Sequence, residues 1–261
     1  MTYTRISVDI EDRIATITLS DPERLNAMSL PMREECLVTL RTLDDGDQAD
    51  CVILTGDGPK AFCAGADINE LKQRTVDSEL SSKARLRREL PRLLETMRLP
   101  TLACINGYCF GAGLEVALAC TLRIAARSAR LGLPEINLGV IPGSGGTQRL
   151  ARMVGLSRAM EMITLGDPVS ADNALASGLL NAVHEDADLM DAGRDICRKW
   201  QTKGPISLAA ARDAVLASQD VDLTTGIDYE RKLFALCLAS GERDEGVSAF
   251  LEKRQANFRK I

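Results

Sequence analysis

Two fully apolar segments, each followed by a loop of small residues and then by a helical pattern, constrain the fold of this chain most. They are residues 51–54 and 101–105. Strands that are apolar on both faces and alternate with helices are typical of a parallel sheet covered on both sides. The sequence therefore predicts an α/β fold whose ligand site lies beyond the carboxyl ends of these strands, where the two small-residue loops fall.

The rest of the chain adds a hairpin before these segments and helices after them. Alternating β-branched residues predict the hairpin, a helix is expected over about 31–43, and further short strands are expected. These patterns occupy residues 6–10 and 14–19 for the hairpin, and 122–126, 130–133 and 179–183 for the short strands. From Ala187 onward only helical periodicity remains. We expect a core over residues 1–200 and a helical region over 201–261 whose apolar faces pack on the core or on another subunit.

A single histidine, His184, narrows the possible chemistry. Paired-histidine zinc sites are excluded, no metal site is expected, and acid/base catalysis would fall to carboxylates. The net charge of −5 gives no global attraction to nucleic acid or to an anionic membrane. The eight cysteines form no CxxC pair, so we expect buried thiols in a reducing cytoplasm. No apolar run reaches about 18 residues, so no membrane span is predicted.

The glycine-rich loops do not fit nucleotide binding. Gly111 and Gly113 would need a third glycine where Val116 stands, and residues 143–146 lack the spacing and the lysine of a phosphate-binding loop. Small residues before a helix can still expose backbone N–H groups that bind negative charge developing on an oxygen. Ala66 and Ala112 are the candidate donors, and tight loop packing is the alternative explanation of their surroundings.

Two glutamates stand in apolar surroundings. Glu115 lies in the first turn of an apolar helix, three residues beyond Ala112, where it could simply favour the helix dipole. Glu135 lies in an apolar loop between Pro134 and Gly139 and could simply be a surface residue. A carboxyl group in such a loop would have a raised pKa and could donate a proton near neutral pH.

Together these segments resemble the enoyl-CoA hydratase (crotonase) family. The motifs that carry the resemblance are residues 62–68, 106–115, 134–135, 141–150 and 249–254. The likeness spans about Ile6 to Phe258 and implies a crotonase-like spiral of ββα units with a C-terminal helical trimerisation region. Hydratases, isomerases, dehalogenases and thioester hydrolases share this scaffold, so the motifs indicate the superfamily more strongly than the reaction.

The resemblance implies a role for each candidate catalytic residue. The amides of Ala66 and Ala112 form the oxyanion hole for the thioester carbonyl. Glu115 orients and activates the attacking water, Glu135 supplies the C2 proton, and the Gly143 amide helps to hold that water. The pair of acidic residues favours hydration of a 2-enoyl-CoA to a 3-hydroxyacyl-CoA over isomerisation, which as a rule needs one. Sequence alone does not decide which glutamate is the acid and which the base.

The resemblance also implies how coenzyme A is bound. The expected contacts from the chain's own core are Arg24, Leu25, Ala27, Ala64, Asp67 and Ile68. Lys253 and Phe258 are expected to come from the helical region of a neighbouring subunit, because the family forms homotrimers that often pair into hexamers. Coenzyme A enters as part of the substrate, and no separate cofactor is expected. Surface charge is the alternative explanation of Arg24 and Lys253.

A basic stretch is the first basis for a competing function. It contains Lys83, Arg85, Arg87, Arg88, Arg92 and Arg98. One branch of the family, the methylglutaconyl-CoA hydratases, is associated with RNA binding. Glu89 and Glu95 interrupt the stretch, Pro91 is expected to break the helix, and no aromatic residue is available for base stacking. We therefore expect a solvated helix face, or one that aids CoA phosphates, and no nucleic-acid site.

A covalent enzyme and an isomerase are two further competing functions. Cys63 or Cys109 could act as a nucleophile in a thioesterase, although His184, in a late strand, is a poor candidate for its base. A delta-3 to delta-2 enoyl-CoA isomerase is the nearest enzymatic alternative. The acyl chain is not readable from the sequence, and its pocket walls are expected in residues 69–98 and at Phe110.

Overall fold

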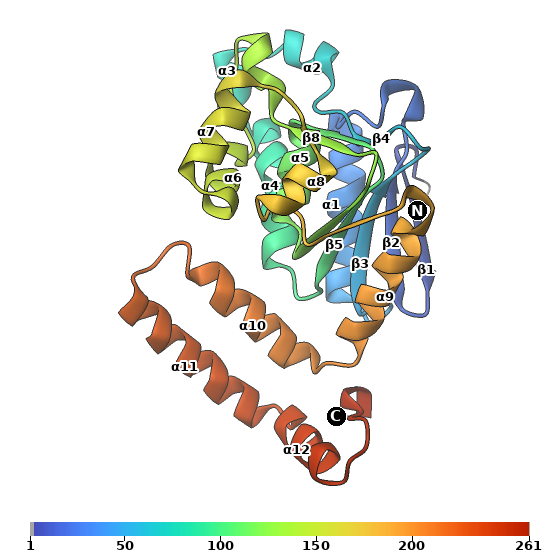
Figure 1. Ribbon diagram of the computed structural model, residues 1–261, viewed down its shortest axis with the longest axis vertical. Helices are drawn as coiled ribbons and strands as arrows, with labels where there is room; N and C mark the ends of the chain where they lie inside the picture. Colours follow the sequence, from blue (N-terminus) through green and yellow to red (C-terminus); the bar gives the residue numbers. More distant parts are fainter. Residues whose placement is uncertain (1–2, 261) are drawn as a thin grey trace.

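The computed structural model describes residues 3–260 and confirms the expected α/β class (Figure 1). A six-stranded sheet has the order β1-β2-β3-β5-β7-β10 and is parallel except for the β1–β2 hairpin. Its strands are Ile6–Glu11, Ile14–Leu19, Cys51–Gly56, Thr101–Ile105, Leu122–Ala126 and Ala182–His184. The last strand begins three residues later than predicted, because the apolar Leu179 and Leu180 are buried in the preceding loop.

A second sheet of four short strands was predicted only in part. Its order is β4-β6-β8-β9, and the strands are Ala61–Cys63, Tyr108–Phe110, Arg130–Gly132 and Val169–Ser170. The strand expected over 130–133 is confirmed as β8. Strands β4 and β6 lie within the two small-residue loops that follow β3 and β5. The other three strands have two or three residues each and are too short to show an alternating pattern, so they were not distinguished from loop. This sheet turns both loops back toward the same point.

Helices cover both faces of the six-stranded sheet. Helix α9 (Leu189–Gln201) packs on one face through a small cluster that includes Cys51, Cys104 and Cys197. The other face contributes to the larger core, which includes side chains from α1 (Leu30–Asp45), α4 (Ser82–Thr96) and α5 (Ala112–Ala119). Seven of the eight cysteines are buried, which confirms the prediction of buried thiols.

The remaining helices complete the core and frame the loops. They are α2 (Ile68–Lys72), α3 (Val76–Leu80), α6 (Gly146–Val154), α7 (Leu156–Leu165) and α8 (Ala171–Ala176). Short 3₁₀ helices lie at Pro22–Arg24 (η1), Pro134–Leu138 (η2), Asp186–Asp188 (η3) and Phe258–Lys260 (η4). In the described part of the chain, no helix is both long and apolar enough to span a membrane.

The expectation that Pro91 breaks its helix is wrong. Helix α4 runs through this proline without interruption. Proline has no N–H to donate to the carbonyl four residues earlier, which here belongs to Arg87. The buried guanidinium of Arg33 supplies a donor to that carbonyl, with 3.4 Å between Nη1 and O. A side chain from α1 thus replaces the missing bond of α4.

The C-terminal helices extend away from the two sheets (Figure 1). They are α10 (Pro205–Ala217), α11 (Leu223–Ala239) and α12 (Glu242–Leu251). The boundary expected near residue 201 coincides with the end of α9. Arg212 joins α10 to the core by donating to the carbonyl oxygens of Glu95, Met97 and Arg98.

Candidate active site

The N-terminus of α5 presents a free backbone amide. The helix begins at Ala112. Gly111 precedes it with a φ of +49°, a conformation that favours glycine, and its own N–H donates to Gly132 at 3.0 Å. The first amides of a helix have no partner within the helix. Among the described residues, no group accepts from the Ala112 N–H.

A second free amide lies in the loop after β4. Met28 donates to the carbonyl of Gly65 at 2.7 Å and forms a parallel bridge with Ala66. In the described part of the chain, the Ala66 N–H has no acceptor either. A Cβ placed on Gly111 would lie 3.6 Å from the Gly65 Cα, so the two small-residue loops touch. The structure therefore brings the Ala66 and Ala112 segments together, as an oxyanion hole requires.

Glu115 is held by the loop that follows η2. Its side chain is buried, and its Oε1 accepts from the amides of Ser144 at 2.6 Å and Gly146 at 2.9 Å. A Cβ on Gly146 would lie 3.1 Å from the Glu115 Cγ, so a side chain there would crowd the glutamate. Among the described groups none bonds to Oε2, which leaves this oxygen for a small polar molecule.

Glu135 lies against the start of the same helix. A Cβ on Gly111 would lie 2.9 Å from the Glu135 Oε1, and the Oε2 atom is buried without a hydrogen-bond partner in the described residues. The pKa of Glu135 is raised to about 7, mainly by burial and also by the negative charge of Glu115, while a backbone hydrogen bond lowers it. This agrees with the predicted direction. Glu135 thus lies against the start of the helix that carries Ala112 and Glu115.

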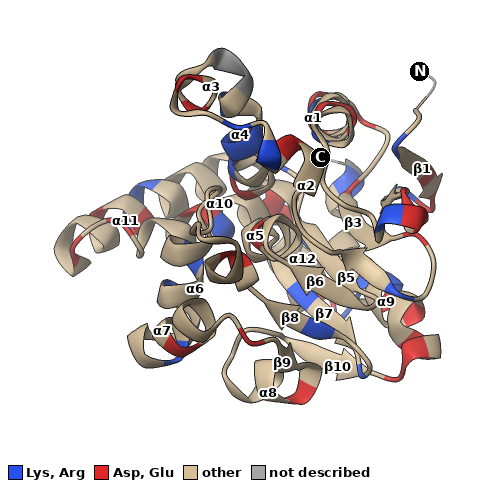
Figure 2. Ribbon diagram, turned by 90° about the horizontal axis from the view of Figure 1, so that it is seen from above, with Lys and Arg blue, Asp and Glu red and all other residues tan. Residues whose placement is uncertain are grey.

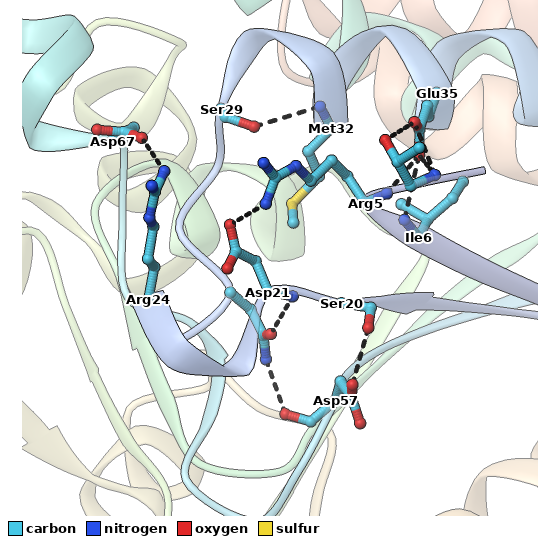
Figure 3. A network of polar contacts seen from close by, with 12 residues as sticks. Arg5, Ile6, Ser20, Asp21, Arg24, Ser29, Met32, Glu35, Asp57 and Asp67 are labelled. Atoms are coloured by element: carbon cyan, nitrogen blue, oxygen red, sulfur yellow. Dashed lines mark hydrogen bonds and ion pairs between the residues drawn. The ribbon is translucent and has the colours of Figure 1, made fainter.

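The residues expected around coenzyme A come from two loops that contact each other, and Figure 3 shows the pair of Arg24 and Asp67. Ala64 donates to the carbonyl of Leu25 at 3.0 Å, and Arg24 pairs with Asp67 at 3.4 Å. Ile68 follows as the first residue of α2 and is exposed. Contacts therefore join residues 24–28 to residues 64–68, although 39 positions separate Leu25 from Ala64 in the chain.

Asn26 joins the first of these segments to Asp21, Asp57 and Ala61 and was not singled out from the sequence. It is fully buried, accepts from the Asp21 N–H at 2.9 Å, and donates to the carbonyls of Asp57 and Ala61 at 3.0 and 2.8 Å. Its φ of +56° is one that asparagine tolerates better than most residues. An asparagine in a loop after a strand was therefore the feature of the sequence that could have pointed to this residue.

Three other predicted residues have different places. Gly143 is exposed, directly precedes the Ser144 whose amide binds Glu115, and has no protein atom within 4 Å of a Cβ placed on it, so its expected role toward water stays a prediction. Lys253 follows α12, and Phe258 lines a cavity of about 380 Å³ with Trp200 and Arg259. The last two lie at the end of the molecule opposite α2 (Figure 1). Their expected contribution from a neighbouring subunit stays a prediction.

The cysteine nucleophile of the covalent alternative is poorly supported. Cys63 and Cys109 are fully buried, and burial raises the pKa of the Cys63 thiol to about 11 and that of Cys109 well above its ordinary value. A buried neutral thiol is a weak nucleophile. His184 ends β10, where its carbonyl accepts from the Arg127 amide.

All residues of the basic stretch except Arg98 lie on α4 (Figure 2). Arg85, Arg88 and Arg92 line a groove of about 550 Å³ together with Arg41 and Glu89, and the last two form an ion pair. The side chain of Lys83 lies outside the described residues. Arg87 differs from its neighbours because it is buried. The expected absence of a nucleic-acid site stays a prediction.

Comparisons with known proteins agree on one family. The family model for enoyl-CoA hydratase/isomerase matches residues 9–260. The chain is 34% identical to the short-chain-enoyl-CoA hydratase of Clostridium acetobutylicum over 98% of this chain and 97% of that protein. It is 36% identical to the 2,3-dehydroadipyl-CoA hydratase of Escherichia coli over 97% of both. The crystal structure of an enoyl-CoA hydratase from Bacillus anthracis superposes with a TM-score of 0.93, at 37% identity over 98% of this chain and 99% of that one.

Proposed function

The chain belongs to the enoyl-CoA hydratase/isomerase family and is an enoyl-CoA hydratase, a hydro-lyase, and we propose that Glu115 and Glu135 add water to its 2-enoyl-CoA substrate. The single observation that carries this proposal is that Glu135 lies against Gly111, at the start of the helix that carries both the Ala112 amide and the buried Glu115. Water adds across the C2–C3 double bond and yields a 3-hydroxyacyl-CoA. The isomerase alternative, which needs one acid/base group, leaves one of the two glutamates without a role.

In the first half of the proposed reaction, Glu115 and the two backbone amides act on water and on the thioester. The thioester carbonyl accepts from the Ala66 and Ala112 N–H groups, so charge that develops on its oxygen during attack at C3 is stabilised. Glu115 accepts a proton from the attacking water through Oε2, because its Oε1 is held by Ser144 and Gly146. Gly143 is proposed to assist that water through its amide.

In the second half of the proposed reaction, Glu135 donates a proton to C2. A carboxyl group with a pKa of about 7 is substantially protonated at neutral pH and can donate. The proton lost by water to Glu115 and the proton gained at C2 from Glu135 balance, and the product carries one added water. Exchange with solvent then restores both glutamates. The pair supplies both proton transfers.

The remaining expectations are part of the same proposal. Arg24, Leu25, Ala27, Ala64, Asp67 and Ile68 bind the coenzyme A portion of the substrate, and Lys253 and Phe258 reach it from a neighbouring subunit. A homotrimer, alone or as half of a hexamer, is proposed because the C-terminal helices expose apolar side chains. We propose that no separate cofactor is needed and that the enzyme acts in the cytoplasm, where its free thiols stay reduced.

Glu115→Gln and Glu135→Gln, assayed separately, test the two-carboxylate mechanism. Each substitution removes an acid/base group but keeps the shape of the side chain, so we expect kcat for crotonyl-CoA hydration to fall about 10²- to 10⁴-fold. Loss of enoyl absorbance measures the rate. Circular dichroism should show unchanged secondary structure in both variants. Hydration at near wild-type rates by either variant would show that the mechanism is wrong.

The isomerase alternative is separated with a second substrate. A 3-enoyl-CoA is offered beside the 2-enoyl-CoA under identical conditions. We expect kcat/KM for hydration of the 2-enoyl substrate to exceed that for isomerisation. The opposite order would favour an isomerase.

A further inference from the structure

Arg149 contacts the loop that holds Glu115 and takes no part in the two proton transfers proposed above. It belongs to α6, which begins directly after that loop. Its Nη1 donates to the carbonyl oxygen of Ser144 at 2.8 Å. The N–H of the same serine donates to Glu115 at 2.6 Å. Ser144 is therefore bonded to the Glu115 carboxylate through one peptide group and to Arg149 through the next.

The peptide group that Arg149 binds lies between the two amides that bind Glu115. Those amides are the N–H groups of Ser144 and Gly146, at 2.6 and 2.9 Å from the Glu115 Oε1. The carbonyl of Ser144 belongs to the peptide that joins it to Gly145, which stands between them in the chain. Because the chain is continuous, a displacement of this peptide would displace both donors. The bond from Arg149 restrains that displacement.

Gly145 allows the close approach of the guanidinium to the loop. Its φ is +105°, a conformation that favours glycine. A Cβ placed on it would lie 2.0 Å from the Arg149 Nη1, so a side chain at this position would displace the guanidinium. The loop and the arginine are therefore in direct contact, with only backbone atoms on the side of the loop.

Glu95 binds the opposite edge of the same guanidinium. The Arg149 Nε donates to Oε1 at 2.5 Å, and its Nη2 donates to Oε2 at 2.7 Å. A paired contact of this kind fixes the orientation of both planar groups and is stronger than a single hydrogen bond. Glu95 lies on α4 next to the fully buried Leu94. All three guanidinium nitrogens thus have partners, two on a core helix and one in the loop that holds Glu115.

We propose that Arg149 and Glu95 are positioning residues for hydration, which hold the loop 143–146 so that Glu115 presents its Oε2 to the attacking water. This inference rests on the proposed hydratase function and deepens it. In this role neither residue touches the substrate. The loop amides hold Oε1, so a shift of the loop would move the whole carboxylate. Misplacement of a reacting group by about 1 Å can lower a rate about 10²-fold.

The alternative explanation is that the pair of Arg149 and Glu95 only ties α6 to α4 and stabilises the fold. A purely structural role would lower the rate by the same factor whether or not the Glu115 carboxylate is present. A role that acts through Glu115 would disappear once this carboxylate is removed. A double-mutant cycle with Glu115→Gln therefore separates the two explanations.

Arg149→Met is the first variant of this cycle. We expect it to lower kcat for crotonyl-CoA hydration about 10- to 100-fold, with KM changed by less than about twofold, because the loop acts on the reacting water and not on substrate binding. In the Glu115→Gln background the same substitution should lower the residual kcat by less than about threefold. Arg152→Met is the matched control, since Arg152 is an exposed arginine of the same helix that donates to Gln148. It should change neither kcat nor KM.

Glu95→Gln keeps the test valid if Arg149→Met does not fold. It retains the shape of the side chain and one oxygen acceptor but removes the charge that strengthens both hydrogen bonds. We expect kcat to fall about three- to tenfold with KM unchanged, and the loss to be absent in the Glu115→Gln background. Circular dichroism should show the same secondary structure in all variants.

Two kinds of outcome would overturn the inference. If both Arg149→Met and Glu95→Gln keep a kcat near that of the wild type, or if their losses are equal with and without the Glu115 carboxylate, the pair does not position Glu115. The hydratase function would then stand. If the wild-type enzyme does not hydrate crotonyl-CoA, or if Glu115→Gln alone keeps the wild-type rate, the proposed function is wrong and this inference falls with it.

Discussion

Helix α5 and helix α11 bury their apolar residues to opposite extents. Every residue of α5 is buried, and the helix carries Glu115 and the Ala112 amide into the core. Helix α11 has no buried residue along its described length. The core is complete within one chain and fixes the reactive groups by itself, whereas the C-terminal helices leave apolar surface for something else to cover.

The exposed side chains of α11 have a helical spacing. Leu223, Ile227, Phe234 and Leu238 follow one another at intervals of four, seven and four residues and are 80%, 48%, 64% and 41% exposed. This spacing places them on one face of the helix. Such a stripe of exposed apolar side chains is typical of a protein contact. We therefore propose that the two regions have different roles, catalysis in the core and assembly through the C-terminal helices.

Ala112→Pro should have the largest effect on the core side of this comparison. Proline is tolerated at the first position of a helix and removes the N–H group, as the chain's own Pro205 shows at the start of α10. Loss of one oxyanion donor should lower kcat about 10²- to 10³-fold. Crotonyl-CoA hydration measures the loss. Unchanged sedimentation would show that assembly is unaffected, and activity near that of the wild type would exclude Ala112 as a donor.

A functional group could be predicted from the sequence only where its role requires a particular type of side chain. Glu115 and Glu135 were found because a carboxyl group is conspicuous in an apolar segment. Ser144 and Gly146 were not found, because they bind Glu115 through backbone amides, which every residue except proline provides. Only the folded loop selects which amides point at the glutamate.

The same distinction explains the fold. The strands 14–19, 101–105 and 122–126 were predicted with the bounds observed, because long β-branched or apolar runs end at polar residues. In the second sheet only β8 was predicted, because the other strands have two or three residues and pair only through tertiary contacts. Pro91 was misjudged because its compensation comes from Arg33, 58 positions away. Local patterns carry no information about such a partner.

Phe234→Asp tests the assembly side. The side chain is exposed in the single chain, so the substitution should leave the core folded. A charge buried in an interface between subunits should weaken association by about 10- to 100-fold, because an interface aromatic is a frequent anchor. Sedimentation velocity over a range of concentrations measures the change. Lys232→Asp, which alters an exposed charge on the same helix, is the control; equal assembly of both variants with wild type would mean that α11 does not mediate it.

Glu135→Gln should raise stability in a pH-dependent way. The pKa of Glu135 rises from 4.5 to about 7 on folding, so ionisation is penalised only in the folded protein. Wild-type stability should therefore be unaffected below about pH 4.5, fall as the pH rises to about 7, and stay lower above it. The variant should be more stable than wild type by about 1 to 3 kcal/mol at pH 8 and equal to it at pH 4. Urea unfolding at both pH values measures this, and an equal gain at both would show that burial of the charge is not the cause.

Arg24→Met should have the smallest effect, and it probes the place where the two regions are proposed to meet. The Arg24 side chain is 57% exposed and its pair with Asp67 spans 3.4 Å, so its contribution to folding should be below about 1 kcal/mol. If Arg24 contacts coenzyme A, its replacement should raise KM for crotonyl-CoA by about two- to fivefold with kcat unchanged, and the increase should be smaller at high salt.

Combined with Lys253→Met, the increase in KM should be additive if both residues bind the same coenzyme A across a subunit boundary without touching. In the dissociated Phe234→Asp variant, Lys253→Met should then have no further effect, whereas a persistent effect there would place Lys253 at the site of its own chain.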